Sequence, residues 1–308
     1  MSAMTTLLRR ELWEHRAILV TPVVVGILIL AALLLPIVAG TFGDVSIDGL
    51  PDDLEDLTPE KVRAIWTVAG AGLAFPFELA MVLVTTFYLL DCLYAERKDR
   101  SILFWKSLPV SDAEVVLSKL VTAVVVIPAV TFAVFAVTSL AGWGITAGFL
   151  SSLGDEGSML VAGPGSVFQG IVLAAYLFAA QALWYLPFYG WLLLVSAFAS
   201  RALLLWATLP PLALMWLERA GLGTNEFAEL LGHRSVGFLE SALRTEDATA
   251  VTRLSNGDTN IAIEATGDVW RLLDPVGFLA SPGLWAGIAV AAAFVAGAIW
   301  LRRYRDEA

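Results

Sequence analysis

The 308-residue chain is 58% hydrophobic and only 16% charged, with a mean hydropathy of +0.77 and a net charge of −10. About a quarter of the residues in an average soluble domain are charged, so this composition excludes an ordinary soluble domain and indicates a membrane protein. The apolar runs are continuous rather than alternating, which favours helical spans over the strands of an outer-membrane barrel. The single cysteine, Cys92, excludes an intrachain disulfide and any Cys-x-x-Cys motif.

A charged segment precedes the first apolar run. Residues 4–16 gather their leucines near one helical face, which predicts an interfacial helix, although Glu11 falls inside that face and Trp13 opposite it. A plain lead-in to the first span is the alternative. No small-residue cleavage site follows the run, so we expect the first span to be retained rather than removed as a signal peptide.

Six apolar runs predict an all-α polytopic membrane protein with a single transmembrane domain over residues 1–308. The predicted spans are about 18–38, 67–93, 120–140, 167–199, 202–217 and 282–301. Pro76 and Glu78 interrupt the second span, and Pro128 lies in the third. Membrane helices tolerate proline where neighbouring groups satisfy the freed carbonyl, so we expect the helices to continue there.

The uncharged run 157–200 leaves two arrangements open. It is too long for one straight helix and barely long enough for two, so it forms either one long helix kinked at Pro187 and Gly190 or two short spans. One kinked helix gives six spans with both termini on the same side of the membrane, whereas two short spans give seven. The positive-inside rule favours the kinked helix.

Three connections between the spans are expected to be polar. Residues 40–66 are acidic, with a short helix predicted to start at Thr58 and Pro59. The glycine- and serine-rich residues 141–166 are expected to form a loop at the far surface. Residues 218–281 form the longest predicted loop, on the extracytoplasmic side, with a helical piece near 236–244 and a hairpin signal at 256–257.

The distribution of charge predicts the orientation. In the six-span topology, most of the 19 lysines and arginines fall in the N-terminal segment, the connection 94–119, Arg201 and the C-terminal tail. Short segments rich in these residues stay in the cytoplasm, so we expect both termini there, in a multi-pass protein of the bacterial inner or plasma membrane. The acidic residues gather on the opposite side.

No catalytic motif accompanies these spans. The two histidines, His15 and His233, are far apart, and the chain has no His-Glu-x-x-His motif, no nucleophile elbow and no cluster of metal ligands. It also has no Gly-x4-Gly-Lys-Ser/Thr phosphate loop. We therefore expect no enzyme activity, metal or cofactor in this chain and no nucleic-acid partner. Any ATP-driven process would need a separate ATPase.

The densest basic cluster lies between the second and third spans, in residues 94–111. Here Glu96-Arg97 is followed by the apolar and aromatic residues 102–105 and then by Leu108-Pro109-Val110-Ser111. This segment resembles the first cytoplasmic loop in the permease subunits of type-2 ABC exporters, in which a Glu-Arg pair ends the second span and a similar proline-containing turn precedes the third. The six spans, the amphipathic start and the missing ATPase motif are similar to that family as well.

The resemblance implies that the segment forms a cytoplasmic coupling helix, which sits in a groove of a nucleotide-binding subunit. The implied ATPase-coupling residues are Glu96, Arg97, Ser101, Phe104, Trp105, Pro109 and Ser111. The family also implies two copies of an ABC ATPase that bind ATP and Mg²⁺, and a second permease subunit, either an identical copy or a close paralogue. Aromatic and arginine side chains often anchor such contacts. A basic loop held at the lipid head groups is the alternative.

Glu78 lies inside the predicted second span. An ionisable side chain there costs about 3 kcal/mol on insertion scales and normally faces protein or water. Two interpretations stay open: Glu78 lines a translocation path or a dimer interface, or it braces the second span against a neighbouring helix. Gln169 and Gln181, in the fourth span, are typical of hydrogen bonds between helices.

These features predict the permease subunit of an ATP-driven exporter, which couples ATP hydrolysis in a separate subunit to substrate export across the lipid bilayer. The alternative is a non-transporting membrane scaffold or sensor, whose basic loop binds lipid or a signalling partner.

Overall fold

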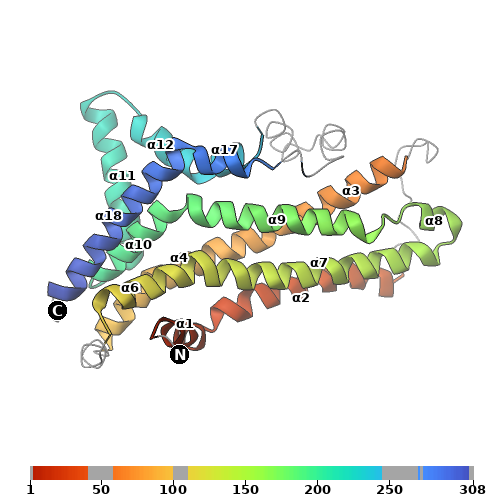
Figure 1. Ribbon diagram of the computed structural model, residues 1–308, viewed down its shortest axis with the longest axis horizontal. Helices are drawn as coiled ribbons and strands as arrows, with labels where there is room; N and C mark the ends of the chain where they lie inside the picture. Colours follow the sequence, from red (N-terminus) through yellow and green to blue (C-terminus); the bar gives the residue numbers. More distant parts are fainter. Residues whose placement is uncertain (1–2, 41–57, 100–109, 245–269, 271–272, 305–308) are drawn as a thin grey trace.

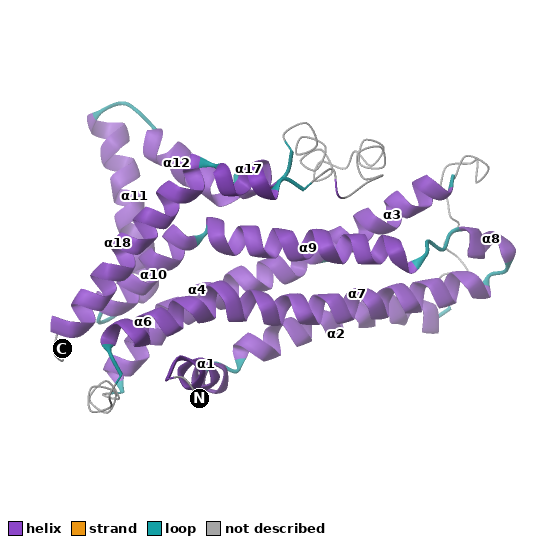
Figure 2. Cartoon of the chain, viewed as in Figure 1, coloured by secondary structure: helices purple, strands orange, loops and turns teal. Residues whose placement is uncertain are grey.

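The computed structural model describes residues 3–40, 58–99, 110–244, 270 and 273–304. In this part of the chain the predicted all-helical fold is confirmed, since it contains helices and connecting loops and no strand (Figure 2). An isolated antiparallel bridge joins Leu243 to Leu273. The predicted coupling helix and the hairpin signal at 256–257 lie outside the described residues.

Fifteen labelled segments make up the described fold. They are α1 (Ala3–Glu14), α2 (Ala17–Val38), α3 (Pro59–Gly72), α4 (Ala74–Lys98), α6 (Asp112–Val121), the π-helix η3 (Thr122–Val126), α7 (Ile127–Ser152), α8 (Asp155–Met159), α9 (Pro164–Trp184), α10 (Leu186–Phe198), α11 (Leu203–Gly221), α12 (Glu226–Val236), α13 (Phe238–Ala242), α17 (Pro275–Ala280) and α18 (Pro282–Tyr304). In Figure 1, α2, α4, α7 and α9 run along the long axis, and α1 is seen almost end-on. The marked N- and C-terminal positions lie toward the same end of the molecule, which we call the terminal end.

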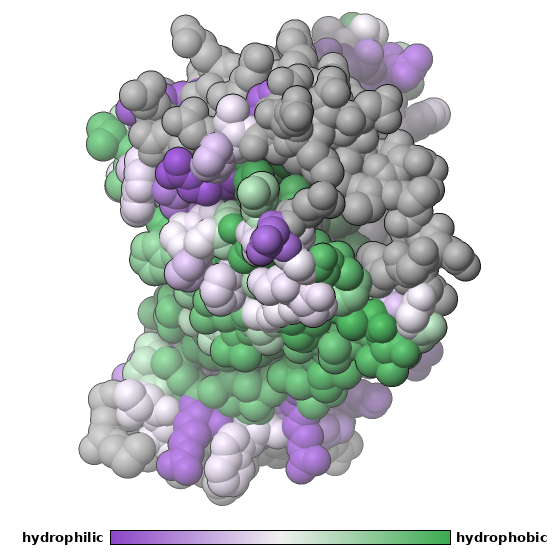
Figure 3. All heavy atoms as spheres, turned by 90° about the vertical axis from the view of Figure 1, so that its right-hand side faces the viewer, coloured by the Kyte–Doolittle hydropathy of each residue, from purple (hydrophilic) through white to green (hydrophobic). Residues whose placement is uncertain are grey.

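Five helical segments of the described chain are long and apolar enough to cross a membrane. They are Ala17–Val38, Ala74–Lys98, Asp112–Ser152, Gly157–Trp184 and Pro282–Tyr304. Figure 3 looks along the long axis on which these helices lie and shows hydrophobic side chains over much of the described middle of the molecule. The chain is therefore a multi-pass helical membrane protein. The predicted fifth span corresponds to α11, which is not among the five, so the total of six spans stays a prediction.

The third span is longer than predicted. Helix α6, η3 and α7 form one continuous helix of 41 residues, so the loop expected at 141–166 is wrong over its first part. Pro128 has no N–H to donate to the carbonyl of Val124, four residues earlier. The π-helical turn Thr122–Val126 lies at this point, and the helix continues through it. The helix ends only before Gly154, whose φ of +99° suits glycine.

The uncharged run after α8 forms two consecutive helices, α9 and α10, which are separated at Tyr185. Pro187 explains the break, because it has no N–H to donate to the carbonyl of Leu183. Helix α10 continues from α9 toward the terminal end (Figure 1). Gly190 lies inside α10 and not at the break.

Gly190 has a packing role instead. A Cβ atom on this residue would lie 3.0 Å from the carbonyl oxygen of Ala291 and 3.2 Å from Cβ of Phe294, both on α18. We expect Gly190→Val to lower the free energy of unfolding by about 1–3 kcal/mol, because the added carbons force α10 away from α18. The control is Gly144→Val in α7, where nothing lies within 4 Å of the added Cβ. Thermal unfolding in detergent measures both, and equal midpoints would contradict close α10–α18 packing.

The second span is preceded by a helix of its own. Helix α3 starts at Pro59, as predicted, after Thr58, whose carbonyl accepts from the N–H of Val62 at 3.1 Å. It is separated from α4 only at Leu73. Pro76 accounts for this break, since its ring conflicts with a helical carbonyl at residue 72.

Candidate functional site

Six charged side chains at the terminal end form a largely buried ion network, consisting of Arg10, Glu11, Glu96, Asp112, Lys119 and Arg302. Nζ of Lys119 lies 2.9 Å from Oε1 of Glu11 and 3.0 Å from Oε1 of Glu96. Arg302 lies 2.5 Å from Oε2 of Glu96 through NH1 and 3.0 Å from Oδ1 of Asp112 through Nε. The network therefore joins α1, α4, α6 and α18.

Most of this network is inaccessible to solvent. Glu11 and Lys119 are each 1% exposed, Glu96 is 4% exposed and Arg302 is 5% exposed. Charges are buried at high cost unless they are paired and hydrogen-bonded. Here each has partners on another helix, and Glu11 also accepts a hydrogen bond of 2.8 Å from the hydroxyl of Tyr88 on α4. The network thus fixes one arrangement of four helices.

Local sequence explains how two of these side chains come to be buried. Glu11 follows Leu7 by four residues on α1, so both lie on one helical face, and that face is buried. Lys119 lies on the buried face of α6 with Val115 and Val116. The sequence prediction missed Lys119 and Arg302 as site residues because basic residues at span ends are ordinary orientation signals. It missed Asp112 because an acidic residue is equally ordinary in the first turn of a helix. The one available signal was Glu11, which interrupts an apolar face.

Arg97 contacts a different helix from its neighbour Glu96. Its NH2 group donates to the carbonyl oxygens of Ser196 and Ala199, at 2.7 Å and 2.6 Å, where α10 ends. Oγ of Ser196 in turn accepts from the backbone N–H groups of Leu93 and Tyr94 on α4, at 3.1 Å and 3.0 Å. The Glu-Arg pair therefore attaches the end of α4 to the ion network on one side and to α10 on the other.

The predicted coupling residues fall into two groups. Glu96 and Arg97 make contacts within this chain, and Ser111 caps α6 in a capping box with Glu114, in which Oγ of Ser111 accepts from the Glu114 N–H at 3.2 Å. The remaining predicted coupling residues, Ser101, Phe104, Trp105 and Pro109, lie outside the described residues. The expected contact with an ATPase stays a prediction.

The ion network includes residues on both sides of the 100–109 segment. Glu96 precedes it by one helical turn, and Asp112 follows it as the first residue of α6. Arg302 of α18 contacts both of these carboxylates. The ion pairs therefore connect the two flanks to α18 directly and to α1 through Lys119.

Glu78 lies on α4 close to Gln181 of α9. Among the described residues, three buried oxygens in this region have no hydrogen-bond partner: Oε2 of Glu78, Oε1 of Gln181 and the hydroxyl of Tyr189. The position beside Gln181 fits the bracing interpretation of Glu78, and the unpartnered oxygens fit a translocation path or an interface.

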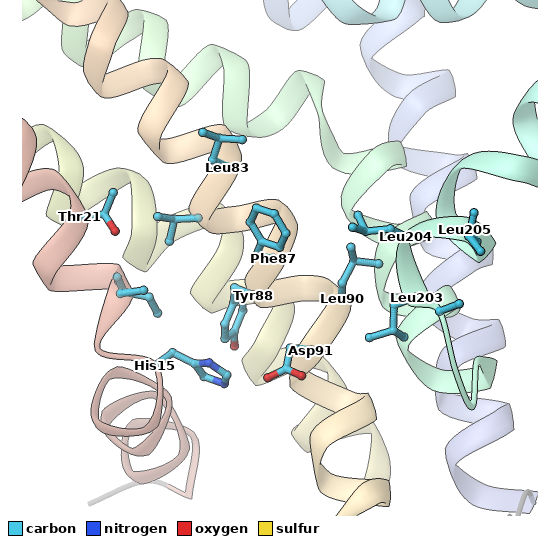
Figure 4. Close-up of a pocket in the computed structure, with 14 residues that line it drawn as sticks. His15, Thr21, Leu83, Phe87, Tyr88, Leu90, Asp91, Leu203, Leu204 and Leu205 are labelled. Carbon is cyan, nitrogen blue, oxygen red and sulfur yellow. The ribbon is translucent and has the colours of Figure 1, made fainter.

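A groove lies between α2, α4 and α11, with a volume of about 710 Å³ (Figure 4). The size falls in the range of small-molecule sites, which is roughly 300–1,000 Å³. Its lining is mostly apolar, with Leu83 and Phe87 on α4 facing the first turn of α11. His15 and Asp91 lie near each other at one end of the groove, below Tyr88 in the view of Figure 4.

Within the described residues, no group of three or more histidine, cysteine, aspartate or glutamate side chains is arranged to hold a metal ion. A scan against protein-family models, a search of curated proteins and a search of solved structures each gave no match.

Proposed function

We propose that this chain is the membrane-spanning permease subunit of an ATP-driven exporter, similar to the type-2 ABC exporters, with both termini in the cytoplasm. A separate ATPase subunit, present in two copies, binds ATP and Mg²⁺ and contacts the segment 94–111. The observation that supports this most is the buried ion network, because it connects Glu96 and Asp112, on the two flanks of that segment, to α18 and, through Lys119, to α1.

The ion network suggests how a movement of the segment 94–111 is transmitted to the membrane-spanning helices. Glu96 and Asp112 both pair with Arg302, so α4, α6 and α18 move as one unit at this end. Arg97 extends the same unit to the end of α10. Paired and packed groups of this kind shift between discrete arrangements rather than deform gradually. ATP-driven motion at the segment would thus reorient several spans together.

Helix α11 supports the proposal that the chain works as a pair. Only Ala207 is buried on this 19-residue helix, and its exposed side chains are mostly large and apolar. They include Leu204, Leu205, Trp206, Leu209, Leu212, Leu214, Trp216 and Leu217. Such a surface has to be covered by lipid or protein. We propose that lipid covers part of it and a second permease subunit, an identical copy or a close paralogue, the rest.

Copurification tests the proposed partner. The chain, expressed in its native host, is expected to retain a Walker-motif ABC ATPase through purification in detergent. Phe104→Ala and Trp105→Ala are each expected to reduce the retained ATPase about tenfold, because truncating an aromatic anchor commonly costs 2 kcal/mol or more. The effect is measured as the ratio of ATPase to permease on stained gels.

The matched control is Trp13→Ala, which truncates an exposed tryptophan on α1, at the same end of the molecule. It is expected to keep the ATPase. If Phe104→Ala and Trp105→Ala both retain as much ATPase as the parent, the segment is not the contact with the ATPase, and a membrane scaffold or sensor is favoured.

A further inference from the structure

The groove between α2, α4 and α11 carries one charged group that the rest of the fold does not use. Asp91 is exposed and lies at the end of a stripe of exposed apolar residues on α4, at four-residue spacing after Leu79, Leu83 and Phe87. No residue in the described part of the chain forms an ion pair or hydrogen bond with it. The neighbouring carboxylates of Glu11 and Glu96, by contrast, are both paired.

The other residues of the groove leave the negative charge of Asp91 uncompensated. None of the lining residues is a lysine or an arginine. His15 is the one lining residue able to become cationic, and burial lowers its pKa, so the neutral form prevails at pH 7. Its ring packs edge-on against Tyr88, with the two ring centroids 4.8 Å apart. A ligand in this groove therefore meets one carboxylate and no opposing cation.

The remainder of the lining fits an apolar body. Phe87 is 57% exposed and offers an aromatic face one helical turn from Asp91, and Leu83 continues the apolar surface. Leu204 and Leu205 of α11 form the opposite wall. A cation over an aromatic ring is attracted by the ring quadrupole, by about 0.5–2 kcal/mol. A phospholipid head group fits less well, because its phosphate has no basic side chain to meet in the lining.

We propose that this groove binds amphiphilic organic cations, with the positive charge at Asp91 and the apolar body against Phe87, Leu83 and the first turn of α11, and that such cations are the exported substrates. The second part rests on the proposed function. Arg97 gives the groove a connection to the predicted coupling segment, since it holds the end of α10, and α11 begins after Ala202 in the groove lining.

Two probes of the same shape and opposite charge test the groove. Purified full-length chain in lipid nanodiscs, without any ATPase, is titrated with tetraphenylphosphonium and with tetraphenylborate, and bound probe is measured by equilibrium dialysis against empty nanodiscs. The cation is expected to bind saturably, and the anion is expected to show no saturable binding. Asp91→Asn is expected to weaken binding of the cation about tenfold.

Two further variants keep the test decisive. Leu204→Trp, which fills the groove, is expected to abolish saturable cation binding, whereas Asp155→Asn, at an exposed site on α8, is expected to leave it unchanged. Equal binding of both probes, or a cation affinity that neither Asp91→Asn nor Leu204→Trp changes, would overturn the proposal. Bound phospholipid detected by native mass spectrometry would then identify lipid as the occupant of the groove. The binding assay needs no ATPase. A negative result in this assay therefore contradicts the groove proposal alone, and a negative result in the copurification contradicts the proposed function alone.

Discussion

Replacing Lys119 by methionine is expected to lower the free energy of unfolding by about 3–5 kcal/mol, the usual cost of removing one partner from a buried ion pair. Methionine has a similar length and no charge, so Glu11 and Glu96 would face each other without the cation that lies 2.9 Å and 3.0 Å from them. Thermal unfolding in detergent, followed by circular dichroism, measures the loss.

A double variant separates the network from simple loss of packing. Adding Glu11→Gln to Lys119→Met neutralises the carboxylate that loses Lys119 as its closest cation, whereas Glu96 keeps its pairing with Arg302, and part of the stability is expected to return. Lys61→Met, at an exposed position on α3, is the surface control and is expected to change stability by no more than about 0.5 kcal/mol. A Lys119→Met protein as stable as the parent would show that the network does not hold these helices together.

The sequence predicted the helical class and most apolar spans because each is a continuous run with polar flanks. It also located the start of α3, where Thr58 and Pro59 form a recognisable cap. Its error at 141–152 has a physical cause: glycine and serine are read as loop formers in soluble proteins, whereas in a membrane helix small residues are common and allow close packing. Gly142, for example, lies buried in α7, where an added Cβ would sit 3.3 Å from Leu33 of α2.

The ion network was less accessible to sequence reasoning. Its members come from four helices, and Glu11 and Arg302 are separated by nearly the whole chain. Hydrophobic periodicity reports which face of a helix is buried, but it does not report which helix covers that face. The family resemblance implies that Glu96 and Arg97 contact another subunit. The structure shows the contacts that these two residues make inside the chain.

Arg97→Met is expected to reduce transport of a bound cation at least tenfold while leaving the ATPase attached. Methionine keeps most of the side-chain volume but cannot donate to the carbonyl oxygens of Ser196 and Ala199, at 2.7 Å and 2.6 Å. Hydrogen bonds from a charged donor contribute about 1.5–3 kcal/mol. Without them, the end of α10 is no longer attached to the proposed coupling segment, and neither is α11, which forms one wall of the groove. Uptake of tetraphenylphosphonium into inverted vesicles with ATP is the measurement.

Arg97→Lys is the matched variant for this prediction. Lysine keeps the positive charge but presents a compact ammonium group in place of the planar fork that serves both carbonyls, so it is expected to restore transport only in part. Copurification with the ATPase and the affinity for tetraphenylphosphonium are expected to match those of the parent in both variants, because the guanidinium of Arg97 is bound to the end of α10 inside the chain and Phe104, Trp105 and Asp91 are unchanged. Transport at the parental rate in Arg97→Met would mean that motion reaches the groove by a route other than the end of α10.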